Sequence, residues 1–246
     1  MHSSVGSVIA LDGETLSDQE QRARRLAMQF SASDALDTLR YAIKQEFPGR
    51  IALVSSFGAE SAALLHLVST VDKTLPVIFL DTGKHYAQTL SFRRKLAREL
   101  GLTDVRDIIP NADQLEKTDP DGDLWKHDAD GCCTLRKVKP LSAALDGFDA
   151  WITGRKQFHG GGRSNLPVFE ASDTHIKVNP LTRWSSDDIA DYVKRHDLPA
   201  HPLVAQGFPS IGCWPCTHPA NDGNDVRAGR WRGAAKTECG IHTLAR

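Results

Sequence analysis

Short apolar runs alternate along this chain with longer stretches of mixed polarity. A short apolar run predicts a buried strand at 51–54, and further strands are predicted at 77–80, 105–109, 150–154 and 176–178. The intervening stretches predict helices over 21–47, where apolar residues recur three and four positions apart, and over 62–68 and 86–100. Strands that alternate with helices indicate an α/β fold, with a mainly parallel sheet covered by helices on both faces.

Local signals mark where several of these elements begin and end. Pro48-Gly49 ends the first helix, and Ser185 with Asp188 resembles a capping box for a helix that runs through Arg195. Residues 111–130 predict a polar loop that leads into a helix beginning near Cys132. No linker divides the chain, so its 246 residues fit one large domain with appendages.

Composition excludes several classes of protein. The formal net charge of -1 provides no overall basic field for nucleic acid. The most apolar window, 51–71, contains Glu60 and His66 and is therefore no membrane span. The N-terminus has no basic region before its apolar run and does not resemble a signal peptide. We expect a cytoplasmic protein that binds neither membrane nor nucleic acid.

Five cysteines carry the most specific chemistry. The tandem Cys132-Cys133 and the pair Cys213 and Cys216 fit a disulfide framework poorly, which favours a metal site over small buried hydrophobes. Zinc and an iron–sulfur cluster both accept four thiolates. Adjacent cysteines reach one small ion only with strain, whereas each can bind a separate iron of a cubane cluster. The pattern therefore favours [4Fe–4S] over zinc.

The fifth cysteine, Cys239, is left free to react. Cations lower the pKa of a nearby thiol and so favour the nucleophilic thiolate, whereas the alternative is a bystander cysteine on a tail. The basic residues upstream of it are Arg227, Arg230, Arg232 and Lys236, and His242 follows three positions later. This setting predicts a nucleophile.

Three loops follow predicted strands, and the carboxyl ends of parallel strands share one edge of a sheet, where ligands bind. Residues 55–61 offer hydroxyls and backbone N–H groups to an anion, although many strand-to-helix turns are rich in serine and glycine. Residues 81–83 form the second loop. Residues 154–163 are rich in glycine and contain three cations, which favours ligand contact over a merely solvated loop.

Taken together, these motifs closely resemble the assimilatory adenylyl-sulfate reductases, within the wider phosphoadenylyl-sulfate reductase family. The matching segments extend over nearly the whole chain from residue 50 and are SSFGAES at 55–61, FLDTG at 79–83, CCTLRK at 132–137, TGR at 153–155, CWPC at 213–216 and ECGIH at 238–242. The resemblance implies a fold like the adenine nucleotide α-hydrolase and PP-loop ATPase group. It also implies a [4Fe–4S] cluster on Cys132, Cys133, Cys213 and Cys216.

Activity and partners also follow from the resemblance. Family members with both cysteine pairs use adenosine 5′-phosphosulfate, and the alternative is an enzyme that uses the 3′-phosphorylated substrate or both. Cys239 attacks the sulfur and AMP departs, leaving an S-sulfocysteine. Thioredoxin, or a glutaredoxin-like thiol donor, then releases sulfite for sulfate assimilation and cysteine biosynthesis.

Roles for other residues follow from this mechanism. The developing charge on the phosphate requires cations, for which the candidates are Lys137, Arg163, Arg227 and Arg230. His242 is expected to contact the substrate or tune the thiol, and the pocket is expected to be lined by Ser55, Ser56 and Ser61. We expect a lead-in over 1–20, a nucleotide-binding reductase domain with the iron–sulfur site over 21–220, and a mobile C-terminal segment over 221–246.

Two other classes compete with this interpretation. A tRNA-thiolating PP-loop enzyme would have Ser-Gly-Gly-x-Asp-Ser in the first loop and a basic surface for RNA. A zinc-stabilised binding module would not need Cys239. Residues 83–89 differ from the Leu-Phe-Pro-Glu-Thr type of continuation in many family members, so Lys84 and His85 receive no role. The oligomeric state is left open, a homo-oligomer included.

Overall fold

A six-stranded sheet forms the centre of the molecule in a computed structural model that describes residues 16–160, 163–172, 174–220, 225–231, 236 and 238–242. Its strands are β1 (Ile51–Val54), β2 (Val77–Leu80), β3 (Val105–Ile108), β4 (Ala150–Ile152), β5 (Phe169–Ser172) and β6 (His175–Val178). Their order is β3-β2-β1-β4-β6-β5, and every neighbouring pair is parallel except β5 and β6. The prediction of a mainly parallel sheet is therefore confirmed.

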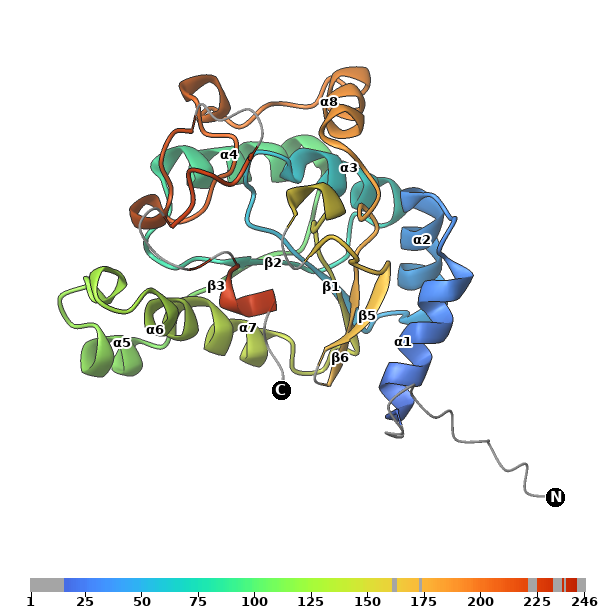
Figure 1. The fold of residues 1–246 in the computed structure, drawn as a ribbon, viewed down its shortest axis with the longest axis horizontal. Coiled ribbons are helices and arrows are strands. Elements are labelled where there is room, and N and C mark those ends of the chain that lie inside the picture. The colour runs from blue at the N-terminus through green and yellow to red at the C-terminus, as the bar shows by residue number, and fades with distance from the viewer. Residues whose placement is uncertain are drawn as a thin grey trace.

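Helices cover both faces of this sheet. The helices are α1 (Asp18–Gln29), α2 (Ala35–Tyr41), α3 (Ser61–Val71), α4 (Ala87–Leu100), α5 (Ala112–Thr118), α6 (Ala129–Cys133), α7 (Lys139–Ala144) and α8 (Ser186–Arg195). Figure 1 shows α3, α4 and α8 above the sheet, with α5, α6 and α7 below it. Helix α1 packs against β5 and β6.

Side chains of successive strand residues pack into two hydrophobic cores, one on each face of the sheet. Ile51 and Leu53 of β1 belong to the larger core with α3, whereas Ala52 packs with Leu141 of α7 in a smaller one. Successive strand side chains point to opposite faces, so a strand buried on both sides is apolar throughout. This is why β1, β2 and β4 could be recognised as apolar runs, whereas β3 contains Arg106 and Asp107 and is not buried.

The single helix predicted over 21–47 is wrong. The chain breaks between α1 and α2, where the Asp34 side chain accepts a hydrogen bond from the Asp37 backbone N–H at 2.7 Å and starts a new helix. A capping aspartate satisfies an N–H group that has no partner within the helix. Helix α1 begins at Asp18, inside the predicted lead-in over 1–20, and residues 1–15 lie outside the described residues.

Strand β5 and helix α5 were not predicted from the sequence, whereas the predicted capping box of α8 is confirmed. Helix α5 lies within the predicted polar loop, where Asn111 accepts a hydrogen bond from the Gln114 N–H at 3.0 Å. The capping box of α8 is present, with the Ser185 hydroxyl and the Asp188 carboxylate each bonded to the other's backbone N–H.

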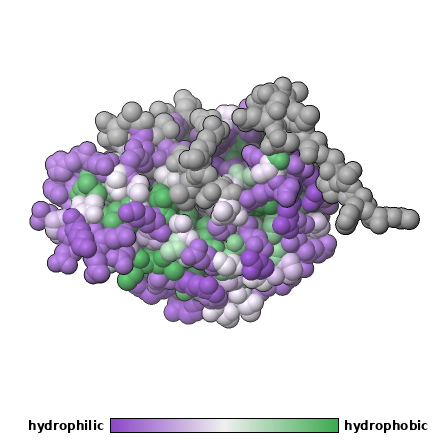
Figure 2. Space-filling model, turned by 90° about the horizontal axis from the view of Figure 1, so that it is seen from below, coloured by the Kyte–Doolittle hydropathy of each residue, from purple (hydrophilic) through white to green (hydrophobic). Residues whose placement is uncertain are grey.

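Figure 2 shows the face that carries α5, α6 and α7, seen from below in the orientation of Figure 1. This face is mostly hydrophilic, with hydrophobic residues gathered in smaller patches toward its middle. Scattered exposed apolar residues of this kind are ordinary on a protein surface. Among the described residues, none of the helices is both long and apolar enough to span a bilayer.

Candidate active site

The sheet order reverses at β1, because β2 and β3 lie on one side of it and β4, β6 and β5 on the other. At such a switch point the loops that follow adjacent strands diverge and leave a crevice. A cavity of about 220 Å³ lies here, lined by the loops after β1 and β4 and by residues 209–212 and 238–242. The three predicted loops do not contribute equally, since residues 81–83 do not line it.

The loop after β1 is fixed by its backbone. Phe57 adopts a positive φ of 48° and is completely buried, with its ring edge-on to Phe79 at 5.7 Å. A Cβ atom on Gly58 would lie 3.1 Å from the carbonyl oxygen of Ile211, so glycine permits this close approach. The turn brings three predicted residues, Ser55, Ser56 and Ser61, to the cavity wall.

The cavity wall is strongly cationic. Its basic side chains are Lys137, Arg155, Lys156, Arg163, Arg227 and Arg230, against the carboxylates of Glu60 and Glu238. Burial and the neighbouring Arg163 lower the pKa of Arg227 to about 10. The Nε atoms of Arg155 and Arg230 are buried without a hydrogen-bond partner. A dry group of cations with unsatisfied donors is suited to bind an anion with several oxygens.

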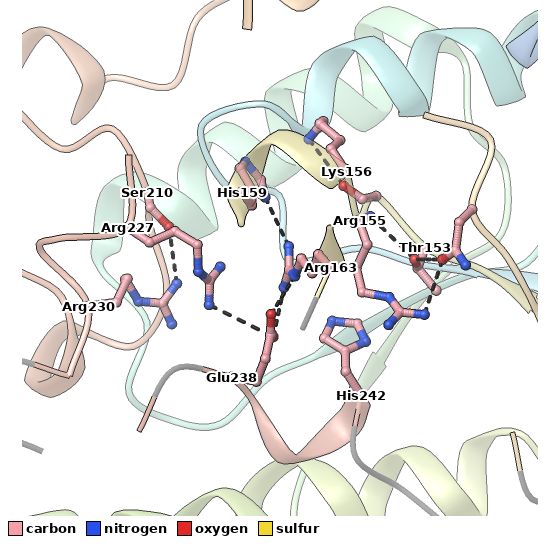
Figure 3. A network of polar contacts seen from close by, with 12 residues as sticks. Thr153, Arg155, Lys156, His159, Arg163, Ser210, Arg227, Arg230, Glu238 and His242 are labelled. Atoms are coloured by element: carbon pink, nitrogen blue, oxygen red, sulfur yellow. Dashed lines mark hydrogen bonds and ion pairs between the residues drawn. The ribbon is translucent and has the colours of Figure 1, made fainter. Parts of the chain in front are cut away.

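A chain of polar contacts joins the β1 loop to the C-terminal residues (Figure 3). Glu60 accepts from Lys156 Nζ at 2.7 Å and lies 3.2 Å from His159 Nε2. His159 Nδ1 is 2.9 Å from Arg163 Nη1, and Arg163 forms a two-pronged ion pair with Glu238. Burial acts to raise the pKa of Glu60, but His159 and Lys156 outweigh it and lower the pKa to about 2. The carboxylate is therefore ionised.

A second, smaller cavity is lined by all four predicted metal ligands, Cys132, Cys133, Cys213 and Cys216. Lys137 lines both cavities and so separates the two sites. Among the described residues, no group of three or more His, Cys, Asp or Glu side chains is arranged to hold a single metal ion.

Hydrogen bonds from β2 and the residues after it hold the wall of this cysteine cavity. The Thr82 hydroxyl lies 3.3 Å from the Cys213 sulfur. The Trp214 N–H donates to the Lys84 carbonyl at 2.8 Å, and His85 pairs with Cys213 through a β-bridge. Lys84 and His85, which had received no role, thus support the turn that carries Cys213.

Cys239 lines the first cavity and neighbours Cys133, which lines the second. Its thiolate accepts a hydrogen bond from the Cys133 thiol, which lowers the pKa of Cys239 and raises that of Cys133. Burial acts to raise the pKa of Cys239, but the charges of Lys137 and Arg230 lower it further, so the net shift is well below the ordinary range. A half-buried thiolate that lines a cationic pocket can act as a nucleophile.

His242 closes the cavity from the C-terminal side. Its ring is parallel to the Trp151 ring within 5°, with the two centroids 6.0 Å apart, and its carbonyl accepts from Lys177 Nζ at 3.2 Å. Burial lowers the pKa of His242 well below its ordinary value, and Arg155 adds to this, so the imidazole is neutral. Its Nδ1 atom is buried without a partner and is available to a ligand.

The structure brings the predicted binding residues together, with one difference in environment. Ser55, Ser56, Ser61, Lys137, Arg163, Arg227, Arg230 and His242 all line the same cavity as Cys239. Arg163, however, is directed at Glu238, and Arg232 lies outside the described residues.

Sequence reasoning gave no individual role to Glu60, Arg155, Lys156 or Glu238. Arg155 is held by Glu170 at 2.7 Å, and Glu170 also pairs with Lys177 at 3.3 Å. Glu170 lies on β5, the strand that was not predicted, so its link to the site had no signal in the sequence. The cations of the loop 154–163 had been expected to contact a ligand, and the structure brings Arg155 and Lys156 of that loop to the cavity wall.

Comparisons with known proteins agree with this geometry. The model of the phosphoadenosine phosphosulfate reductase domain matches residues 50–219. A relative from Mesorhizobium japonicum, named adenosine 5′-phosphosulfate reductase, is 50% identical over 207 residues, which cover 84% of this chain and 82% of that protein. A relative of the same name from Chelativorans sp. is 52% identical over 194 residues, 79% of each protein.

Solved structures show the same fold. A phosphoadenylyl-sulfate reductase from Candida auris, in a phosphate complex, has a TM-score of 0.68 at 27% identity and covers 87% of this chain and 100% of that one. An FMN adenylyltransferase from Candida glabrata has a TM-score of 0.54 at 15% identity over 82% of this chain and 74% of that one, a likeness of fold alone. Because the domain model matches residues 50–219 and the Mesorhizobium japonicum relative is 50% identical over 84% of the chain, this chain belongs to the phosphoadenosine phosphosulfate reductase family.

Proposed function

We propose that this chain reduces adenosine 5′-phosphosulfate to sulfite and AMP, with electrons from thioredoxin or a similar dithiol. The observation that carries the proposal is the position of Cys239 in a cationic pocket, where Lys137 also lines the neighbouring cavity of the four other cysteines. The names of the relatives from Mesorhizobium japonicum and Chelativorans sp. support the choice of substrate. A thiol-dependent reaction of this kind belongs in the reducing cytoplasm.

The reaction divides into two thiol transfers. The Cys239 thiolate attacks the sulfur of the phosphosulfate, the sulfur–oxygen bond to the phosphate breaks, and AMP leaves with the electron pair. The product on the enzyme is an S-sulfocysteine. A thiolate of the donor then attacks the Cys239 sulfur, sulfite leaves, and the second donor thiol resolves the mixed disulfide. The donor is oxidised by two electrons and the sulfur is reduced by two.

The pocket residues bind and orient the substrate in this proposal. Ser55 and Ser56 lie in the loop after β1 and Ser61 begins α3, and their hydroxyls, with the backbone N–H groups of the helix start, favour an anionic nucleotide. Arg230, Arg227 and Lys137 stabilise the charge that develops on the phosphate as AMP departs, and the free Nε of Arg155 adds a further donor. Neutral His242 contacts the substrate through its unpartnered Nδ1.

The four remaining cysteines fit a [4Fe–4S] cluster. They line one cavity, and Cys132, Cys133 and Cys213 are buried there, so thiolate donors are gathered away from water. Cys132 and Cys133 are adjacent in the chain, so each can bind a separate iron of a cubane cluster, whereas both reach one zinc ion only with strain. When bound, the cluster supplies charge and shape to the wall beside Lys137, while the two donor thiols supply the electrons.

Domain motion is also part of the proposal. Cys239 must meet the substrate first and the donor protein second, so residues 238–242 have to leave the pocket between the two transfers. We therefore retain the division into a reductase domain over 21–220 and a C-terminal segment that moves.

Sulfite release by anaerobically purified protein tests the function, with reduced thioredoxin and either adenosine 5′-phosphosulfate or its 3′-phosphorylated analogue. We expect a strong preference for the former. Equal use of both would identify a dual-substrate reductase, and a preference for the 3′-phosphorylated analogue would match the name of the Candida auris neighbour. Release from neither would reject the proposal and favour a thiolating PP-loop enzyme.

A Cys239→Ser variant tests the nucleophile. It should keep the iron and sulfide of the wild type and release no sulfite, and turnover by this variant would reject the assignment. One zinc per chain, with no iron or sulfide, would identify the cysteine cavity as a zinc site.

A further inference from the structure

The segment Glu238–His242, called here the Cys239 segment, is held on both sides of its thiol. On one side, Glu238 accepts from Arg163 Nη2 at 2.7 Å and from Arg163 Nε. On the other, the His242 ring stacks on Trp151 and its carbonyl accepts from Lys177. The thiol therefore lies between a charged contact and an aromatic contact, and both come from residues distant in the chain.

Arg163 is built as an anchor. Its side chain is only 7% exposed, and its remaining nitrogen, Nη1, contacts His159, which in turn contacts Glu60 in the β1 loop. A guanidinium held in this way presents a fixed fork to a carboxylate, which gives direction as well as attraction. Figure 3 shows Glu238 between Arg163 and Arg227, with Arg227 Nη2 at 3.9 Å.

We propose that the Arg163–Glu238 ion pair is a positioning latch, which holds Cys239 in the pocket for the first transfer and opens for the second. The proposal rests on the proposed function, since it takes Cys239 as the nucleophile. It assigns Arg163 to the Cys239 segment and leaves the unpartnered Nε donors of Arg155 and Arg230 to the substrate. Neither residue of the latch reacts; both act through the position of the thiol.

The rate at which iodoacetamide modifies Cys239 tests the latch without substrate. The cluster-loaded protein is compared with Glu238→Gln, Arg163→Gln and the double variant at one pH, and the modified peptide is identified by mass. A latch predicts that both single variants react about tenfold faster, which corresponds to about 1.4 kcal/mol. The double variant should react no faster than either single one, because the same contact is lost.

The two substitutions separate a latch from simple electrostatics. Glu238→Gln removes a negative charge near the thiol, and Arg163→Gln removes a positive one. If charge alone governed the reaction, the first would accelerate modification and the second would slow it. The proposal would be overturned if the two substitutions changed the modification rate of Cys239 in opposite directions, or if neither changed it. Glu238→Asp and Arg163→Lys keep the charges but lose the matched fork, and intermediate rates are expected.

A matched control pair lies at the other end of strands β1 and β4, away from the cavity. Arg50 and Asp149 form another two-pronged pair, at 2.6 and 2.7 Å, between the residues that precede β1 and β4. Asp149→Asn should leave the modification rate of Cys239 unchanged. In turnover, the latch variants should lose kcat about tenfold with a smaller change in KM. The modification experiment requires no turnover, so a wild type without sulfite release would reject the proposed function and leave the latch to be judged by modification alone.

Discussion

The buried pair of Glu60 and Lys156 allows a quantitative test of what holds the pocket together. Lys156 is 3% exposed, and its Nζ donates to the Glu60 carboxylate at 2.7 Å and to the Gly154 carbonyl at 3.1 Å. Glu60→Gln keeps the shape of the side chain and removes its charge. The lysine then remains buried without a counter-ion, which is costly in a region of low dielectric constant.

The size of the effect follows from the pKa of Glu60. Its value of about 2 in the folded protein lies below the ordinary 4.5, so the carboxylate contributes stability above pH 4.5 and loses it as pH falls toward 2. A difference of about 2.5 pKa units corresponds to about 3 kcal/mol at pH 7, where the whole contribution is present. We therefore expect Glu60→Gln to lower the free energy of unfolding by about 3 kcal/mol.

Urea unfolding at pH 7, followed by tryptophan fluorescence without oxygen and at matched iron content, measures this loss. The double variant Glu60→Gln with Lys156→Met removes both charges and should recover stability to within about 1 kcal/mol of the wild type. Asp149→Asn breaks an exposed pair and should cost less than about 1 kcal/mol. A Glu60→Gln variant as stable as the wild type, or a double variant weaker than the single one, would refute the reasoning.

Three further predictions concern the two cavities and one buried histidine. Cys132→Ser should reduce the iron content from about four atoms per chain to nearly none, measured by colorimetric assay, and retained iron would contradict its role as a ligand. Arg230→Gln should lower kcat/KM for adenosine 5′-phosphosulfate about 100-fold with an unchanged circular dichroism spectrum, and a smaller loss than tenfold would argue against contact with the phosphosulfate. Burial lowers the pKa of His201 to about 4, so folding resists its protonation, and between pH 7 and pH 5.5 this residue should reduce the free energy of unfolding by about 1 kcal/mol. Urea titrations at the two pH values should show that His201→Gln lacks this part of the decrease, and an identical decrease in both proteins would contradict the assignment.

Sequence patterns predicted correctly those elements whose structure depends only on residues close together in the chain. Strands β1, β2 and β4 were visible because both of their faces are buried, and the α8 cap was visible because Ser185 and Asp188 form it with each other alone. The same rules failed for the break between α1 and α2, where an apolar periodicity continued across a capping aspartate. They also failed for β5, whose register is set by pairing with β6 and whose Glu170 reaches Arg155.

The sequence by itself determined the fold class, the residue types of the chemistry and the nucleophile proposed here, because short motifs with fixed spacing carry that information. Only the tertiary structure decided which partner each charge takes. Arg163 lies 75 residues from Glu238, and Lys156 lies 96 residues from Glu60, so nothing local favours either pair. Such pairs form because the sheet order places the ends of β1 and β4 side by side and buries their cations away from water, where each needs a partner.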